Sequence, residues 1–283
     1  ALTTSPYRIW SGMRKVVVGQ WEAKKAGFWD KAVRKSSPLR AALLREIRNE
    51  IGVALGMDIL QVLWDIRKFY DSMGLYPLIK AAMNLEYPLH TFYMAMLVHR
   101  APRRLSAENG VSRSIPVGQF SILAGCMQSV AFSRIFLYDI LEHIHNAYRP
   151  ISIETWVDDM VQRAQGKSMK KMISLTVASA TYLVKELGDR GCAMAGDKCI
   201  ILGTCNKATK LVQSKLHKVG IKIKVGEAGK DLGLDTTVAK VRKTAAFKAR
   251  LWKGKVKAKK LRALVRQVKE VGSLFNAAIK TVA

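Results

Sequence analysis

Apolar residues recur every three or four positions at both ends of the chain, and this period predicts helices there. The front, residues 1–57, contains two such stretches, 7–25 and 37–55, separated by a polar and basic loop at 30–37. From residue 240 onward the same spacing returns with a high density of lysine and arginine. Both ends of the chain are therefore predicted to be helical and cationic.

The centre of the chain follows a different pattern. A short, β-rich apolar run at 57–65 predicts a buried strand that ends in a carboxylate, Asp65. A long amphipathic helix is predicted over 127–148, and Pro150 ends it. The remaining elements predicted for the centre are a helix at about 167–189, a strand within 191–203, a helix at 206–220, a strand at 221–225 and a glycine-rich turn region at 226–235. This order of elements indicates an α+β fold.

Two adjacent acids interrupt one of the strand-like segments. Residues 151–157 alternate between apolar and polar, and 160–164 resume the pattern after Asp158 and Asp159. Such alternation predicts a β-hairpin with both acids in its turn. Aspartate is common in turns for backbone reasons alone, so a plain hairpin is the alternative interpretation.

The overall charge narrows the range of partners. The 283 residues are 49% hydrophobic, enough for a sizeable globular core, and 48 Lys and Arg against 21 Asp and Glu give a formal net charge of +27. Solubility alone does not require so large an excess, so a polyanionic partner is expected. Nucleic acid fits best because each neutralised phosphate releases counterions. An anionic membrane surface and ribosomal association are the alternatives.

Several classes of protein do not fit the sequence. The chain has no apolar run long enough to span a bilayer and no signal peptide, and we expect it to be a soluble fragment of something longer. Its cysteines lack paired CxxC spacing, which predicts buried thiols in a reducing compartment. A zinc site at Cys192, Cys199 and Cys205 is a weak alternative, because their spacing is not typical of such sites. His143 and His145 lack the i,i+4 spacing of a helical zinc pair.

Three carboxylates end or interrupt apolar strands: Asp65, Asp158 and Asp159. Acids in such places are costly to desolvate, so they must face water or meet cations. Strands that bring acids side by side can bind a pair of divalent ions, the arrangement used in phosphoryl transfer. In a cationic protein, a small acidic island lets metal ions sit where the reactive phosphate of a polyanion arrives.

Five stretches that include these acids resemble, in order, the motifs of the reverse transcriptase family, especially its non-LTR retroelement and group II intron branch. They are WDIRKFYDSM (64–73), ILAGCMQSVAFSRIFL (122–137), WVDDM (156–160), LGDRGCAMAGDKCIIL (187–202) and KDLGLD (230–235). The resemblance covers nearly the whole chain. It implies an α+β right-hand polymerase fold, with fingers, a palm built on an antiparallel sheet, and a helical thumb.

The resemblance also implies catalytic roles. Asp65 and Asp158 would be shared ligands of two Mg²⁺ ions, with Mn²⁺ as a substitute, and Asp159 would support them. Lys198 would protonate the leaving pyrophosphate or neutralise its charge, although lysines also commonly end turns as solvated residues. The implied activity is RNA-directed DNA polymerisation, the transfer of a nucleotide from a dNTP to a primer 3′-hydroxyl.

For the nucleotide pocket, the resemblance implies a further set of residues. Tyr70 would be the steric gate that packs under the sugar and excludes a 2′-hydroxyl; a core aromatic is the alternative. Ala124 and Gly125 would form the turn that opens the long helix, with Ser129 at its typical position in that helix. Arg34 is a candidate contact to the nucleotide or the template.

Other implied contacts lie at the two ends of the chain. Leu232 and Gly233 correspond to the core of the primer-grip turn. Arg8 and Lys35 join Arg34 as candidate template or nucleotide contacts. The cationic tail would follow the backbone of the template–primer duplex through charge and shape, although a lysine-rich face is often merely solvated.

The implied domains are N-terminally truncated fingers at 1–57, a palm at 58–236 with an inserted fingers segment at about 75–118, and a partial helical thumb at 237–283. The implied partners are an RNA template, a DNA primer and dNTP, and no membrane is expected. The resemblance implies a location inside the cell and in the nucleus, where the integrating members of the family act on DNA. The sequence indicates no oligomeric state.

One position departs from the family pattern. Most relatives carry Gln before the glycine of the second motif, where it contacts the incoming nucleotide, and this chain has Ala124. Gln119 or Gln128 are possible substitutes. The departure keeps two alternatives open: a catalytically degenerate, reverse-transcriptase-like protein that binds nucleic acid, and a basic structural protein that meets RNA or membrane through its tail.

Overall fold

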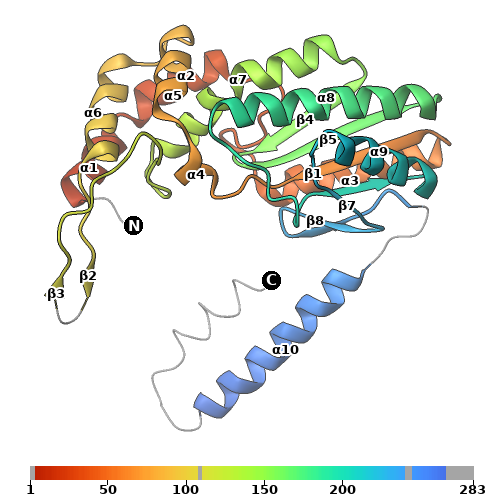
Figure 1. Cartoon of the computed structure of the whole chain (residues 1–283). Coiled ribbons are helices and arrows are strands. Elements are labelled where there is room, and N and C mark those ends of the chain that lie inside the picture. The colour runs from red at the N-terminus through yellow and green to blue at the C-terminus, as the bar shows by residue number, and fades with distance from the viewer. Residues whose placement is uncertain (1–3, 108–109, 240–243, 266–283) are drawn as a thin grey trace.

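The computed structural model describes residues 4–107, 110–239 and 244–265. The helices are α1 (Ser5–Met13), α2 (Lys15–Lys25), α3 (Pro38–Ala54), α4 (Phe69–Ser72), α5 (Leu75–Asn84), α6 (Leu89–Arg100), α7 (Ser129–Ala147), α8 (Met169–Asp189), α9 (Asn206–Lys218) and α10 (Ala245–Val265). The strands are β1 (Asp58–Trp64), β2 (Ser106–Ala107), β3 (Gly110–Val111), β4 (Ile151–Trp156), β5 (Asp159–Gly166), β6 (Ile200–Gly203), β7 (Lys224–Val225), β8 (Gly229–Asp231) and β9 (Leu234–Thr236). The fold is a mixed α+β fold (Figure 1).

A five-stranded sheet forms the centre, in the order β4-β5-β1-β6-β7. β1 lies in the middle and runs antiparallel to both β5 and β6, and only β6 and β7 are parallel. Two small hairpins, β2-β3 and β8-β9, stand apart from this sheet. The antiparallel sheet expected from the sequence is therefore the dominant feature.

Strand β1 is buried on both of its faces, because helices cover the sheet on either side. α7 and α8 lie over one face and α3 over the other (Figure 1). Val62 and Trp64 belong to the main core, whereas Ile59 and Leu63 belong to a smaller cluster. This alternation is the two-residue period of a strand, and the continuous apolar run in β1 follows from burial on both sides.

Several predicted elements are confirmed. Helix α7 lies within the predicted 127–148, and α3 within 37–55. The single helical stretch predicted over 7–25 divides at Arg14 into α1 and α2.

Three predictions around the strands need correction. The hairpin turn contains Val157 and Asp158 only, because Asp159 already pairs with Trp156 and begins β5. The strand predicted at 221–225 is reduced to β7. The glycine-rich region at 226–235 contains a hairpin, β8-β9, because Leu232 and Gly233 both adopt positive φ, the conformation that a tight two-residue hairpin turn requires.

The described part of the tail is the basic helix α10, which contacts β9. The thumb was predicted at 237–283, and within that range residues 240–243 and 266–283 lie outside the described residues. Within the described ranges, none of the helices has the length and apolar character needed to cross a membrane.

Candidate active site

A cleft of about 550 Å³ opens at the end of β1. Three of the predicted catalytic residues line it: Asp65, Asp159 and Lys198. The predicted primer-grip pair, Leu232 and Gly233, lines the same cleft. Residues that the sequence places in four separate motifs thus meet at one edge of the sheet, and this space is called the carboxylate cleft below.

Asp65 is placed by the strand that precedes it. Its backbone carbonyl accepts a hydrogen bond of 2.8 Å from the Ala195 N–H, and its own N–H donates to the Cys199 thiol at 3.5 Å. These bonds fix the chain after β1 against the loop that carries Lys198. The Lys198 ammonium lies 3.5 Å from the Asp65 carboxylate, and both side chains are partly exposed, so the pair contributes little to stability.

The contacts of the cysteine thiols argue against a zinc site. Cys192 and Cys199 are buried, and their thiols contact Ser72 and Asp65 respectively. In the described ranges no group of three or more His, Cys, Asp or Glu side chains could hold a metal ion. The weak alternative of zinc at Cys192, Cys199 and Cys205 is therefore not supported.

The hairpin tip presents the acid pair. Trp64 of β1 pairs with Met160, so the turn that carries Asp158 lies beside the end of β1 and close to Asp65. Val157 adopts φ 62°, a left-handed conformation that is costly for a β-branched residue. Strain of this kind is concentrated at functional sites.

Asp159 carries the clearest electrostatic signature in the cleft. Its partial removal from water, followed by the nearby carboxylates of Asp158, Asp231 and Asp65, raises its pKa to about 6, and Arg45 opposes the rise. Negative charge at the hairpin tip is therefore incompletely neutralised by the protein itself. Such a site favours a bound cation.

We expect Asp159→Asn to stabilise the fold at pH 8. The pKa of Asp159 is higher in the folded protein, about 6, than the ordinary 3.8, so its ionisation opposes folding as pH rises through this range. Because the side chain is exposed, we expect the variant to raise Tm by only about 1–3 °C at pH 8. The gain should shrink toward zero below about pH 4. Thermal denaturation of both proteins at the two pH values, without divalent metal, measures it; a gain that is larger in acid contradicts the assignment.

The same donors bear on metal binding. Asp65, Asp158 and Asp159 do not form a ready-made three-residue metal cluster. Mg²⁺ is often held by one or two carboxylates and completed by substrate phosphates and waters, so a preformed cage is not required. Oxygen donors with excess negative charge fit Mg²⁺ chemically, and the assignment of these residues as metal ligands stays a prediction.

Tyr70 lies between the hairpin tip and the turn before α7. Burial, and then the carboxylate of Asp158, raise the pKa of Tyr70 to about 12. The Tyr70 carbonyl accepts a 2.7 Å hydrogen bond from the Ile122 N–H, which attaches the start of the second motif to the first. Tyr70 is only partly buried, so it is neither fully enclosed in the core nor fully exposed to solvent.

The turn before α7 exposes Ala124 and Gly125, and Gly125 has φ +82°. Ser129, at the first position of α7, donates a hydrogen bond from its hydroxyl to the Leu123 carbonyl at 2.6 Å, which fixes the turn to the helix. A glycine suits the left-handed position because it carries no Cβ.

Gln128 is not available as a substitute for the missing glutamine. It is buried, its amide nitrogen donates to the Ser11 hydroxyl at 2.9 Å, and its carbonyl accepts from the Tyr87 hydroxyl at 2.8 Å. These bonds hold the side chain inside the protein. Gln119 is exposed, and its backbone carbonyl accepts a hydrogen bond from the Leu75 N–H.

The predicted fingers contacts lie elsewhere. Arg34 and Lys35 line a second cleft of about 910 Å³ beside α2, together with Lys15. Arg8 is exposed on α1 and lines neither cleft. The structure therefore does not bring Arg34 into the carboxylate cleft with Asp65.

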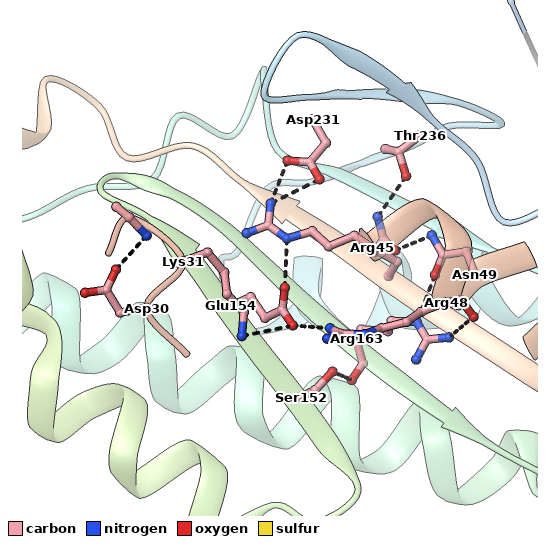
Figure 2. A network of polar contacts seen from close by, with 12 residues as sticks. Asp30, Lys31, Arg45, Arg48, Asn49, Ser152, Glu154, Arg163, Asp231 and Thr236 are labelled. Atoms are coloured by element: carbon pink, nitrogen blue, oxygen red, sulfur yellow. Dashed lines mark hydrogen bonds and ion pairs between the residues drawn. The ribbon is translucent and has the colours of Figure 1, made fainter. Parts of the chain in front are cut away.

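Sequence reasoning missed a buried ion network around Arg45 (Figure 2). Arg45 of α3 is 3% exposed; it donates to both carboxylate oxygens of Asp231 at 2.8 and 3.1 Å, and to Glu154 at 3.0 Å. Arg48 and Lys31 also pair with Glu154. The available signal was the position of Arg45 on the side of its helix that also carries small residues.

The fold, but not the sequence, is similar to known structures. No family model matches the chain, and the search of curated proteins found no match. Apo telomerase from Candida tropicalis truncated from its C-terminal domain aligns at 12% identity and a TM-score of 0.52, over 84% of this chain and 44% of that one.

Two further telomerase structures from Candida tropicalis show weaker likenesses. The apo form aligns at 11% identity and a TM-score of 0.47, over 84% of this chain and 39% of that one. The complex with a TWJ fragment of telomeric RNA aligns at 13% identity and a TM-score of 0.48, over 69% of this chain and 33% of that one. The chain spans less than half the length of these telomerases, and it shares the fold of the stretch that aligns with the truncated apo form.

Proposed function

We propose that the chain is the RNA-directed DNA polymerase domain of a retroelement of the non-LTR or group II intron type. The observation that carries the proposal is the carboxylate cleft, where Asp65, the Asp158–Asp159 hairpin tip and the Leu232–Gly233 turn meet at the end of β1. The likeness in fold to telomerase, a reverse-transcriptase-related polymerase, supports the same class.

In the proposed reaction, the primer 3′-hydroxyl attacks the α-phosphate of a dNTP and pyrophosphate leaves. Asp65 and Asp158 would hold two Mg²⁺ ions, with Asp159 in support; when bound, the ions supply charge neutralisation and a more acidic hydroxyl. Lys198 lies at the same cleft and neutralises the charge of the leaving pyrophosphate. Alignment and electrostatic stabilisation provide most of the rate.

The other predicted site residues bind and select the substrates. Tyr70, beside Asp158, packs under the sugar and discriminates against a 2′-hydroxyl. The exposed Ala124–Gly125 turn provides space for the incoming nucleotide without the glutamine contact of most relatives. Leu232 and Gly233 hold the primer end.

We assign residues 1–57 to the fingers, 58–236 to the palm with an inserted segment at about 75–118, and 237–283 to part of the thumb. Helix α10 exposes a run of lysines with no acidic residue inside the helix. Cations arranged this way follow phosphates without reading the bases, and a net charge of +27 suits a template–primer duplex.

A second candidate function is nucleic-acid binding without polymerisation. It is favoured by Ala124 and by the internal bonds of Gln128, which leave the second motif without its usual amide. The basic structural alternative fits less well, because a protein that only meets RNA or membrane has no need for three acids grouped amid cations.

Primer extension on an RNA template tests the proposal. We expect the chain to extend a DNA primer with dNTPs in the presence of Mg²⁺ or Mn²⁺, and chelation by EDTA to abolish extension. If the chain does not extend the primer while it still binds the RNA–DNA duplex, the binding function replaces the polymerase.

A further inference from the structure

Helix α3 is packed with its polar side inward. The residues that it buries include Arg45, Glu46 and Asn49 beside two alanines. Its exposed side carries apolar residues at a strict four-residue spacing, each 39–65% exposed: Leu39, Leu43, Ile47, Ile51 and Leu55. A surface helix that serves only stability buries its apolar side and exposes its charges. The inward polar side of α3 therefore calls for another explanation.

The buried charges of α3 hold both strands of the β8-β9 hairpin. Arg45 reaches the end of β8 through its two bonds to Asp231. The neighbouring Glu46 reaches the end of β9, where it accepts a 2.7 Å hydrogen bond from the Thr236 hydroxyl and one of 3.1 Å from the Thr237 N–H. Two consecutive residues of one helix thus hold the two ends of the hairpin in place.

Arg45 also joins the hairpin to the catalytic strand pair. Its Nε donates to Glu154 of β4, the strand that leads into the Asp158 turn (Figure 2). The turn that Asp231 precedes, Leu232–Gly233, lines the carboxylate cleft together with Asp159 of this strand pair. A single guanidinium therefore bonds both to the strand that leads into the acid pair and to the residue before the predicted primer-grip turn.

Buried ion networks of this kind add little to stability. The desolvation of Arg45 and Asp231, each 3% exposed, offsets most of their attraction, and well-packed apolar residues often serve as well. What such a network does supply is a fixed geometry, since a guanidinium bonds carboxylates in a planar and directional way. The turn needs such support, because Leu232 has φ 47°, which is unfavourable for a side chain with a Cβ.

We infer that Arg45 is a positioning residue that holds the Leu232–Gly233 turn against the carboxylate cleft, so that a primer end on the turn is aligned with the acids. The inference rests on the proposed function. Arg45 lines neither of the two clefts described above and acts through Asp231 and Glu154.

The test compares two substitutions at Arg45 with a matched control in the full chain. Arg45→Met removes the guanidinium with little change of volume, and Arg45→Lys keeps a charge without the planar fork. The control is Arg134→Met, because Arg134 is also buried and pairs with two carboxylates, Glu22 and Asp30, but does not contact the turn.

Primer extension is measured per active site, by burst titration, so that loss of folded protein does not count. We expect Arg45→Met to lower kcat about 100-fold, because displacement of a reacting group by about 1 Å has this effect, while KM for dNTP changes less than about twofold. Arg45→Lys should recover about a tenth of the parent kcat. Arg134→Met should keep kcat within about threefold of the parent.

Hydrogen exchange supplies a readout that does not depend on activity. We expect amides at 229–236 to exchange at least about tenfold faster in Arg45→Met, with no such local change in Arg134→Met. Equal kcat per active site in Arg45→Met and the parent, or unchanged exchange at 229–236, overturns the inference. A parent that fails to extend any primer overturns the proposed function instead, and the exchange result then still decides whether Arg45 holds the turn.

Discussion

Asp158→Asn is expected to reduce primer extension by about 10³-fold or more while leaving duplex binding within about threefold. Asp158 is half-buried at the tip of the β4-β5 hairpin, where its carboxylate acts on both Asp159 and Tyr70. Amide for carboxylate preserves shape but removes the negative charge proposed to hold the metal ions, and transition-state stabilisation is lost with it. Single-turnover extension on an RNA template, with fluorescence anisotropy for binding, measures both quantities.

A matched control is Asp189→Asn, an exposed acid at the end of α8 that pairs with Lys185. We expect it to extend primers at the parent rate. Extension that survives Asp158→Asn would show that the chemistry takes place elsewhere. Loss of binding and of extension in equal measure would show that Asp158 supports the fold rather than the reaction.

Phe132→Ala is expected to lower the free energy of unfolding by about 3–5 kcal/mol, the usual cost of removing a fully buried aromatic ring. Phe132 is fully buried in α7, with its ring 5.9 Å from that of Tyr87, 5.4 Å from Phe92 and 5.6 Å from His99. These contacts join α7 to α6 and to the segment before it. Urea denaturation followed by circular dichroism measures the loss.

Tyr76→Ala is the control for this substitution, because Tyr76 is 78% exposed on α5. Surface substitutions of this kind change stability by less than about 0.5 kcal/mol. A loss below about 1 kcal/mol for Phe132→Ala would mean that α7 is not packed as described.

Local patterns were sufficient for most of the elements that surround the cleft, but not for the β8-β9 hairpin. The apolar run at 57–65 predicted β1 and its terminal Asp65, and the three-and-four spacing predicted α7. Alternation predicted the β4-β5 hairpin, although its turn proved to be one residue shorter on the Asp159 side. A hairpin can be predicted in this way because its two strands are neighbours in the sequence. An amphipathic helix can be predicted because the spacing of its buried residues repeats within a short stretch of sequence.

The buried side of α3 could not be predicted in the same way. Its leucines and isoleucines at four-residue spacing predict a helix correctly, but they predict the wrong buried side. The side that is buried carries Arg45, whose partners Glu154 and Asp231 lie 109 and 186 positions away in the sequence. The spacing of apolar residues within one helix does not indicate which residues so far away in the sequence will form ion pairs with it.

By itself, therefore, the sequence determined β1, the β4-β5 hairpin, α7, the cationic character and the presence of three strand-associated acids, since each depends on neighbouring residues or on composition. Only the tertiary structure decided that Asp65, the hairpin tip and the Leu232–Gly233 turn share one cleft, that Gln128 is bonded inside the core, and that Arg34 lies in another cleft. These facts depend on the pairing of β1 with β5 and β6 and on the ion network of α3, which bring distant residues together through burial and charge.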